Sequence, residues 1–211
     1  MLRNAAIAAL ASLGCAIACA APASKGAYFG GSIGGTRADV DCAGASSCDR
    51  TSLAGKIYGG YKVTDNWALE GIYFRNGKVK EQAATPQGTI DGSAKVEGLG
   101  VGAAWHQAID SDWEGVARLG VARHRTRARA NASLPIFADG AASTMATTGW
   151  STDPYLGVSL GYKVAPNVVV DAGWDFTVVS PKFRNGNAGA LASTSYRANV
   201  NTLSVGMRFD F

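Results

Sequence analysis

The chain has 211 residues and a formal net charge of +4, and charged residues make up 17% of it. This charge is too small to predict nucleic-acid binding, and a hydrophobic share of 47% excludes a disordered chain. The high glycine content, 27 residues, favours a single β-rich domain with many tight turns.

The N-terminal residues have the pattern of a cleaved signal peptide. Arg3 precedes a small-residue apolar stretch, residues 5–20, which is too short and too rich in alanine for a membrane-spanning helix. Two sequences of the A-x-A type, at 18–20 and 21–23, are alternative cleavage sites. We therefore expect an exported protein whose domain organisation is a signal peptide over residues 1–23 and a mature domain over residues 24–211.

Two cysteines remain in the expected mature domain, Cys42 and Cys48, in a segment rich in Gly, Ser and Asp. Exported proteins meet an oxidising compartment, so we expect a disulfide that closes this small loop. The alternative is a metal site, but two cysteines and two distant histidines do not match the ligand spacing of zinc. We expect neither a metal nor a cofactor.

Apolar and polar residues alternate along the mature chain with a period of two, which predicts β-strands. Leu99, Val101, Ala103 and Trp105 share one face of such a segment. The segments are longer than the usual five or six residues of a strand. In chain order the expected strands are residues 27–39, 51–63, from 67 onward, 93–106, 113–130, 150–164, 168–182 and 196–211.

Short and long connections alternate between these strands. Tight turn signals lie at 64–66, 110–112 and 165–167, and Trp67 and Trp113 stand directly beside two of them. The longer polar connections are residues 40–50, 82–92, 131–149 and 183–195. Short turns at one end, long loops at the other and aromatic residues at the strand ends are typical of an up-and-down barrel in an outer membrane.

The two faces of the expected strands differ in polarity. The apolar face of the last strand carries Leu203, Val205, Met207, Phe209 and Phe211. The opposite faces of the strands carry charged residues, which require a wet or paired interior: Lys56, Glu70, Glu114, Arg118, Asp171, Asp175 and Arg208. We therefore expect the apolar faces to contact lipid and the charged residues to form a polar network inside the barrel.

With these features the mature chain resembles the small outer-membrane β-barrels of Gram-negative bacteria, the OmpA-type and opacity-like surface proteins. The alternating last strand that ends in Phe211 looks like the assembly signal that those proteins present to the barrel-insertion machinery. The resemblance implies an all-β fold, an eight-stranded antiparallel up-and-down transmembrane β-barrel with short periplasmic turns and four longer extracellular loops. It also implies a location in the bacterial outer membrane.

Four arginines, Arg123, Arg125, Arg127 and Arg129, stand at every second position of the fifth expected strand. A strand places all four on one face. The preceding stretch, residues 113–121, is about as long as a tilted strand needs to span the membrane, so the arginines follow where the lipid-facing band ends. Arginine binds phosphate oxygens bidentately, which predicts contact with lipopolysaccharide. The alternative is a solvated face that keeps the strand soluble.

The expected function is that of a surface protein with a structural and interaction role: contact with lipopolysaccharide and adhesion to a host or envelope ligand through the loops. A narrow passive pore is the alternative, although an eight-stranded barrel is just wide enough for side chains to fill. A lipid A-modifying enzyme is the second alternative. His124 and Thr126 resemble the His-x-Ser of the deacylases, but no acidic residue stands beside them. We expect no enzyme.

Overall fold

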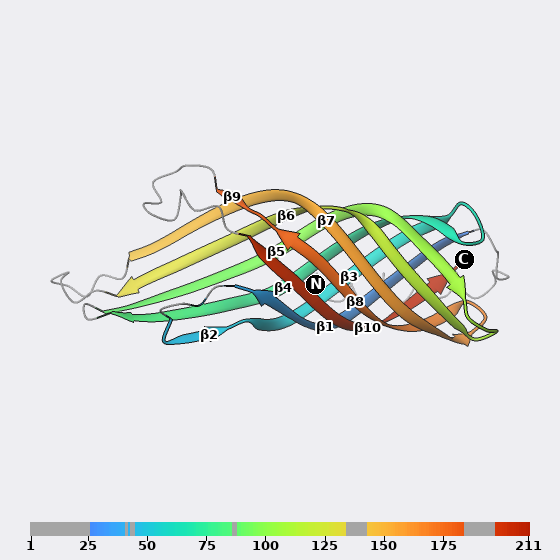
Figure 1. Cartoon of the computed structure of the whole chain (residues 1–211), viewed down its shortest axis with the longest axis horizontal. Coiled ribbons are helices and arrows are strands. Elements are labelled where there is room, and N and C mark those ends of the chain that lie inside the picture. The colour runs from blue at the N-terminus through green and yellow to red at the C-terminus, as the bar shows by residue number, and fades with distance from the viewer. Residues whose placement is uncertain (1–25, 41, 43–44, 86–87, 134–142, 184–196) are drawn as a thin grey trace, which may run out of the picture.

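The computed structural model describes residues 26–40, 42, 45–85, 88–133, 143–183 and 197–211 (Figure 1). Its strands are β1 (Ala27–Asp39), β2 (Ser47–Asp49), β3 (Thr51–Lys62), β4 (Trp67–Thr85), β5 (Gly88–Ala108), β6 (Trp113–Ser133), β7 (Ser143–Ala165), β8 (Val168–Val179), β9 (Lys182–Phe183) and β10 (Ala198–Asp210). The described residues include no helix long and apolar enough to cross a membrane. The expected signal peptide, residues 1–23, lies outside the described residues.

Eight of these strands form a closed antiparallel barrel, which confirms the predicted fold class. Neighbouring strands follow the order β4-β3-β1-β10-β8-β7-β6-β5, and pairing between β4 and β5 closes the sheet. The first and last strands are therefore neighbours, with Phe29 of β1 opposite Phe209 of β10. The two short strands lie outside this ring: β2 pairs with β4, and β9 pairs with β7. Closure leaves the barrel itself without an unpaired strand edge.

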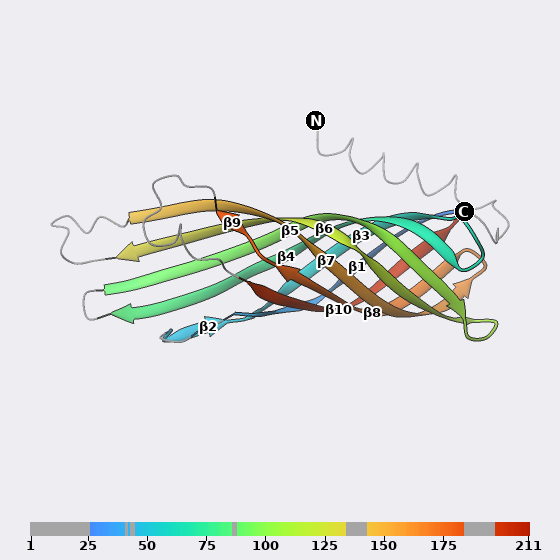
Figure 2. The same cartoon turned by 45° about the horizontal axis from the view of Figure 1, so that its top comes forward.

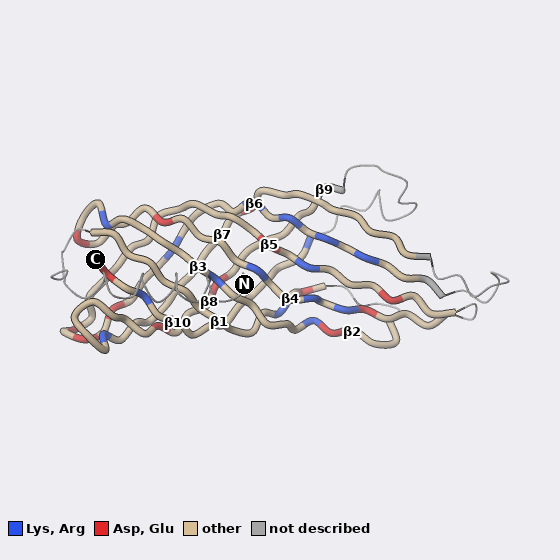
Figure 3. The backbone as a smooth tube through the Cα atoms, turned by 180° about the vertical axis from the view of Figure 1, so that it is seen from behind, with Lys and Arg blue, Asp and Glu red and all other residues tan. Residues whose placement is uncertain are grey.

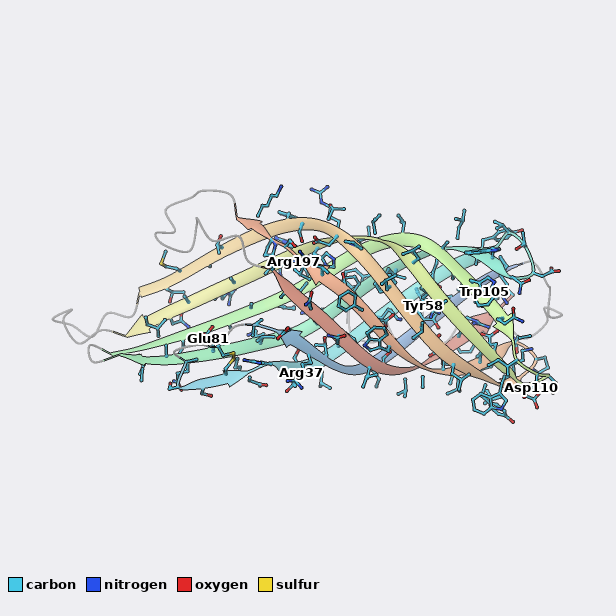
Figure 4. All side chains as sticks on the ribbon, in the orientation of Figure 1. Arg37, Tyr58, Glu81, Trp105, Asp110 and Arg197 are labelled. Carbon is cyan, nitrogen blue, oxygen red and sulfur yellow. A yellow bond between two sulfur atoms is a disulfide. The ribbon has the colours of Figure 1, made fainter. Side chains whose placement is uncertain are left out.

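Three tight connections join the strands at one end of the barrel, which we call the short-turn end. They are residues 63–66, 109–112 and 166–167. In the first, the Trp67 N–H donates to the Thr64 Oγ1 at 2.9 Å. In the second, Asp110 accepts hydrogen bonds from backbone N–H groups. Trp105 and Asp110 are both labelled near this end in Figure 4, and Glu81 marks the opposite end.

Four strands continue well beyond the rest of the barrel, as Figure 2 shows for β4, β5, β6 and β7. Arg75, Glu97, Arg125 and Trp150 lie side by side across these strands. We call the part of β4–β7 on the far side of this row from the short turns the extension. Much of the connections expected at 82–92 and 131–149 is therefore strand, so the predicted loops there were too long. A bulge between Arg75 and Lys78 shifts the pairing of β4 with β5 and interrupts the alternation that marks a strand.

The outward and inward faces of the barrel are chemically opposite. Large apolar side chains point outward and stay exposed, among them Leu53, Ile33 and Leu203, as expected for a surface that contacts lipid. Inside, aromatic rings fill the narrow lumen. Glycine makes room for them: a Cβ at Gly98 would lie 2.3 Å from the ring of Phe74, a separation that real atoms do not allow.

Candidate functional site

The outward face of β4, β5 and β6 carries a dense group of cations around the start of the extension. We call this group the basic patch; its members are Arg75, Lys78, Lys80, Lys95, Arg123, Arg125, Arg127 and Arg129. Figure 3 shows the Lys and Arg positions of these three strands next to one another. The four arginines expected from the sequence all point outward, because the alternate residues Ala122, His124 and Thr126 point inward and are buried.

Strand register brings like charges directly together in this patch. Lys78 of β4 is opposite Lys95 of β5, and Lys95 is opposite Arg127 of β6. Directly opposite side chains on one face lie about 4.5–5.5 Å apart at their Cβ atoms, and like charges at that distance destabilise a sheet. Three cations in one row therefore create a strongly positive strip that favours a bound anion.

One carboxylate moderates this charge. Glu97 Oε1 lies 3.1 Å from Arg127 Nη2 and 3.7 Å from Arg125 Nη1. Among the described residues Glu97 is the acidic side chain within ion-pair distance of the patch, and Asp49 of β2 lies opposite Lys80. Glu97 cannot neutralise the cations on both sides of it. Exposed pairs of this kind contribute little to stability. Most of the positive charge of the patch therefore remains available to a partner.

The electrostatic environment of Lys95 shows this imbalance. Desolvation among its neighbours, and then repulsion from Arg75, lower the pKa of Lys95 from its ordinary value of 10.5. Arg127 and Lys78 act in the same direction, and attraction to Glu97 opposes them only in part. An anion bound next to Lys95 would reverse this shift, because it would stabilise the protonated amine.

An aromatic ring supports two of the arginines. The guanidinium carbons of Arg123 and Arg125 lie 5.2 Å and 5.5 Å from the centre of the Trp150 ring. Such cation–π contacts hold planar guanidinium groups in place, and pre-positioned groups lose less freedom when they bind a ligand. The patch is thus partly organised before any anion arrives.

Half of the basic patch was missed in the sequence. Arg75, Lys78, Lys80 and Lys95 were not recognised because their significance depends on which strands pair. On β5 the outward position of Lys95 could have been inferred, because it shares its face with Glu97 and the apolar Leu99 at every second position. On β4 the bulge after Arg75 keeps Lys78 and Lys80 on the outward face, and no local periodicity reveals this.

The predicted interior residues lie inside the barrel and pair with one another. Lys56 Nζ donates to Asp175 Oδ2 at 2.6 Å, and the Tyr58 hydroxyl donates to Asp171 Oδ2 at 2.9 Å. Figure 4 shows Tyr58 within the barrel wall, where it is 2% exposed. Each carboxylate thus has a cationic or hydroxyl partner, as buried charges require.

A second group of paired charges lies deeper, towards the short-turn end. Arg118 Nε donates to Glu70 Oε1 at 2.9 Å, and the Tyr28 hydroxyl donates to the other Glu70 oxygen at 2.9 Å. Arg208 donates to both oxygens of Asp210, at 2.7 and 3.0 Å, and to Glu114. Arg118 and Arg208 are 4% and 1% exposed, so these pairs fill the lumen of the barrel.

Neither histidine has the surroundings of a catalytic base. His124 is fully buried, its ring packs against Phe74, and its Nε2 lies 3.1 Å from the Thr177 Oγ1. The Thr126 hydroxyl, which the sequence had suggested as a partner, makes no hydrogen bond in the structure. His106 Nδ1 lies 4.0 Å from Glu114, whose carboxylate is already bound by Arg208. In the described part of the chain no cluster of metal-ligating side chains occurs.

Two other predicted sites can be located. Cys42 and Cys48 are joined by a disulfide, beside the point where β2 pairs with β4. Leu203, Val205, Met207 and Phe209 follow one another on the outward face of β10, and Phe211 comes directly after it. The Phe211 N–H donates to the Ala27 carbonyl at 2.9 Å, so the chain end is attached to the start of β1. A role of this strand in assembly stays a prediction.

A family model described as an outer membrane protein β-barrel domain matches residues 6–209. The crystal structure of Ail, the attachment invasion locus protein of Yersinia pestis, is 18% identical, covers 89% of this chain and 99% of its own, and gives a TM-score of 0.48. Neisserial surface protein A is 19% identical, covers 88% and 97%, and gives a TM-score of 0.48. OprG of Pseudomonas aeruginosa is 14% identical, covers 89% of this chain and 97% of its own, and gives a TM-score of 0.46. No curated protein matches the chain.

Proposed function

Because the chain belongs to the family of outer membrane β-barrel proteins and lies in the bacterial outer membrane, we propose that its basic patch binds the phosphate groups of lipopolysaccharide. In this proposal the protein is a surface-exposed structural and interaction protein whose extension lies on the extracellular side. The single observation that carries it is a patch of outward cations directly beyond the lipid-facing band.

The position of the patch supports a ligand at the membrane surface. On β6 the outward residues from Trp113 to Val121 form the apolar band, and Arg123 begins the patch immediately after it. Arg123 lies opposite Leu99, one of the last exposed apolar residues of β5. A cation at this level meets lipid head groups, and the head groups of an outer leaflet carry phosphate.

The chemistry of the patch supports an anion with several phosphate oxygens. Its guanidinium groups can each bind two oxygens, and the Lys78–Lys95–Arg127 row adds point charges beside them. A solvated face would not need cations opposite one another, because like-charged pairs cost stability. The alternative of a purely solubilising surface therefore explains the arginines of β6 less well now that their neighbours are known.

The interior favours this surface role over a narrow pore. Tyr58 and Arg208 are each no more than 2% exposed, and the paired charges around them occupy the lumen. We propose no catalytic activity, because His124 is fully buried and the Thr177 hydroxyl beside it is held by backbone carbonyls. Adhesion to host or envelope ligands through the long loops at the same end is a further part of the proposed role.

The test is lipopolysaccharide retention by variants of the patch. Replacing Arg123, Arg125, Arg127 and Arg129 with serine should lower the amount of co-purified lipopolysaccharide by about tenfold or more, since each charge-assisted hydrogen bond contributes about 1.5–3 kcal/mol. Replacing the same four with lysine should give an intermediate loss. Heat-modifiable migration on gels checks that each variant still forms a barrel.

Two controls separate phosphate binding from general effects. Lys163→Ser removes a cation at the short-turn end and should leave retention unchanged. Lipid A from which the phosphates have been removed should bind the wild-type protein as weakly as intact lipid A binds the serine variant. Equal retention by the wild type and the serine variant would overturn the proposal.

A further inference from the structure

The inward face of the barrel changes polarity where the extension begins. Below this level the inward side chains are the paired charges, such as Glu70 and Arg118. Within the extension most of them are small or apolar, such as Val79, Ala94 and Ala128, and Glu81 is the charged residue on this face of β4. The outward faces there are basic and polar, so the extension has the pattern of a water-soluble β-structure, with apolar residues inside.

The side chains of the described residues do not fill this apolar interior. A cavity of about 340 Å³ lies between the extension and the neighbouring ends of β1, β3, β8 and β10; we call it the extension cavity. Its apolar lining includes Ala38, Val40, Val79, Val96, Ala128 and Met145. Protein cores are packed closely, and voids much larger than a water molecule are rare in them. Small-molecule sites, in contrast, are typically apolar spaces of about 300–1,000 Å³.

The cavity also has polar groups without partners. The hydroxyls of Ser52 and Thr126 are buried and make no hydrogen bond among the described residues, and both residues line the cavity. Thr126 is only 6% exposed. A buried hydroxyl without a partner costs free energy. A few unsatisfied polar groups on an otherwise apolar wall are what fixes the orientation of a bound small molecule.

The charges around the cavity limit what it can accept. Lys80 and Arg129 border it, but both belong to the outward basic patch and are exposed. Glu81 also borders it and is exposed. Near Ser52 and Thr126 the buried lining residue Asn76 is uncharged. A ligand with a charged group would lose its hydration there without gaining an ionic partner.

We propose that the extension cavity binds a small uncharged amphiphile, with its apolar chain against the valine and alanine walls and its hydroxyl or carbonyl group on Ser52 and Thr126. A medium-chain alcohol has this chemistry. The cavity lies on the opposite face of these strands from the basic patch and shares Lys80 and Arg129 with it at the border. The proposed site therefore stands whether or not the patch binds lipopolysaccharide.

The two methionines of the barrel provide a direct test. Met145 lines the cavity, whereas Met207 points outward on β10 in the apolar band. The protein is labelled with ¹³C at the methionine methyl groups, placed in lipid nanodiscs and titrated with 1-octanol. The Met145 signal should shift and saturate. The Met207 signal should follow only the alcohol that dissolves in the bilayer, without saturation.

Variants of the cavity lining test whether the shift of the Met145 signal arises from binding in the cavity. Ala128→Leu should take up part of the space and weaken the saturable shift, and Ala94→Leu provides the same test from the neighbouring strand. Ala84→Leu, which is exposed on β4, is the matched control and should leave the titration unchanged. Thr126→Val should weaken 1-octanol binding by about three- to tenfold, the effect of one neutral hydrogen bond, and n-octane should bind the wild type correspondingly less well.

Three results would overturn the proposal. One is a Met145 shift that does not saturate, or that is absent, in a protein that migrates as a folded barrel. Another is a saturable shift that occurs at the same 1-octanol concentration as in the wild type in both Ala94→Leu and Ala128→Leu. The third is equal binding of n-octane and 1-octanol, which would remove the assigned role of the Ser52 and Thr126 hydroxyls.

Discussion

Lys78 and Lys95 lie directly opposite each other across β4 and β5, on the outward face of the sheet. Arg127 continues the same row on β6, so repulsion acts on Lys95 from both sides. The chain retains this arrangement although it costs stability in the free protein. An anion that bridges the row would convert the cost into a favourable interaction.

Removing the central charge should therefore have opposite effects in the two states. Lys95→Gln should raise the urea concentration at which the barrel unfolds in phospholipid vesicles without lipopolysaccharide, because it relieves repulsion by Lys78 and Arg127. With lipopolysaccharide present, the variant should gain less stability than the wild type. Tryptophan fluorescence in urea, measured with and without lipopolysaccharide, gives both values.

The control for this experiment is Lys163→Gln, at the short-turn end. It removes the same charge far from the patch. Its urea midpoint should equal that of the wild type without lipopolysaccharide, and lipopolysaccharide should stabilise both proteins equally. A lower midpoint for Lys95→Gln in the absence of lipopolysaccharide would show that the row is not under repulsion.

Removing one member of the buried Arg118–Glu70 pair should destabilise the barrel more than removing both members does. Glu70→Gln or Arg118→Met leaves one buried charge without its ionic partner, and we expect each to lower the free energy of unfolding by about 3–5 kcal/mol. The double variant removes both charges, so its loss should be smaller than the sum of the two. Urea unfolding of all four proteins in vesicles measures this coupling; strictly additive losses would show that the two groups do not interact.

The barrel could be predicted from the sequence because its determinants are local. Alternation along residues such as Leu99, Val101 and Ala103 marks a strand wherever the strand lies. Turn signals such as the one at 110–112 then place the ends of strands. One face of each strand is apolar and the other carries charged residues. Together with this difference, the local features were sufficient to predict eight strands, their antiparallel order and which face meets lipid.

The extension and its two surfaces could not be predicted in the same way. On β4 both faces after Arg75 mix polar and small residues, with Glu81 beside Val79 on the inward face, and the bulge interrupts their period. On β6 the arginine alternation was visible, but its partners on β4 and β5 depend on register. The apolar cavity depends on residues from several strands, such as Ala38, Val96 and Met145, that are distant in sequence.

The filled lumen predicts that the barrel does not conduct. Arg208 and Tyr58 close the interior together with the Lys56–Asp175 pair, so planar-bilayer recordings of the wild type should show no steady single-channel openings. Tyr58→Ala combined with Arg118→Ser removes two large side chains from the lumen and should produce such openings. Steady openings of the wild type would support the pore alternative, and a correctly folded but silent double variant would show that other groups close the path.

The turn between β5 and β6 should make a pH-dependent contribution to stability through Asp110. This residue lies at the short-turn end (Figure 4), and its Oδ1 accepts hydrogen bonds from the backbone N–H groups of Asp112, at 2.8 Å, and Trp113, at 2.7 Å. These bonds favour the ionised carboxylate and lower the pKa of Asp110 below its ordinary value of 3.8. The folded state therefore binds this proton less readily than the unfolded state.

The direction of the pH effect follows from that shift. Because the pKa of Asp110 is lower in the folded protein, its contribution is fully present above the ordinary value of 3.8 and is lost as the pH falls through the lowered pKa. Asp110→Ala should thus unfold at lower urea concentration than the wild type at pH 7, and the difference should shrink towards pH 2. A constant gap between Asp110→Ala and the wild type from pH 7 to pH 2 would mean that the turn does not depend on the charge of Asp110.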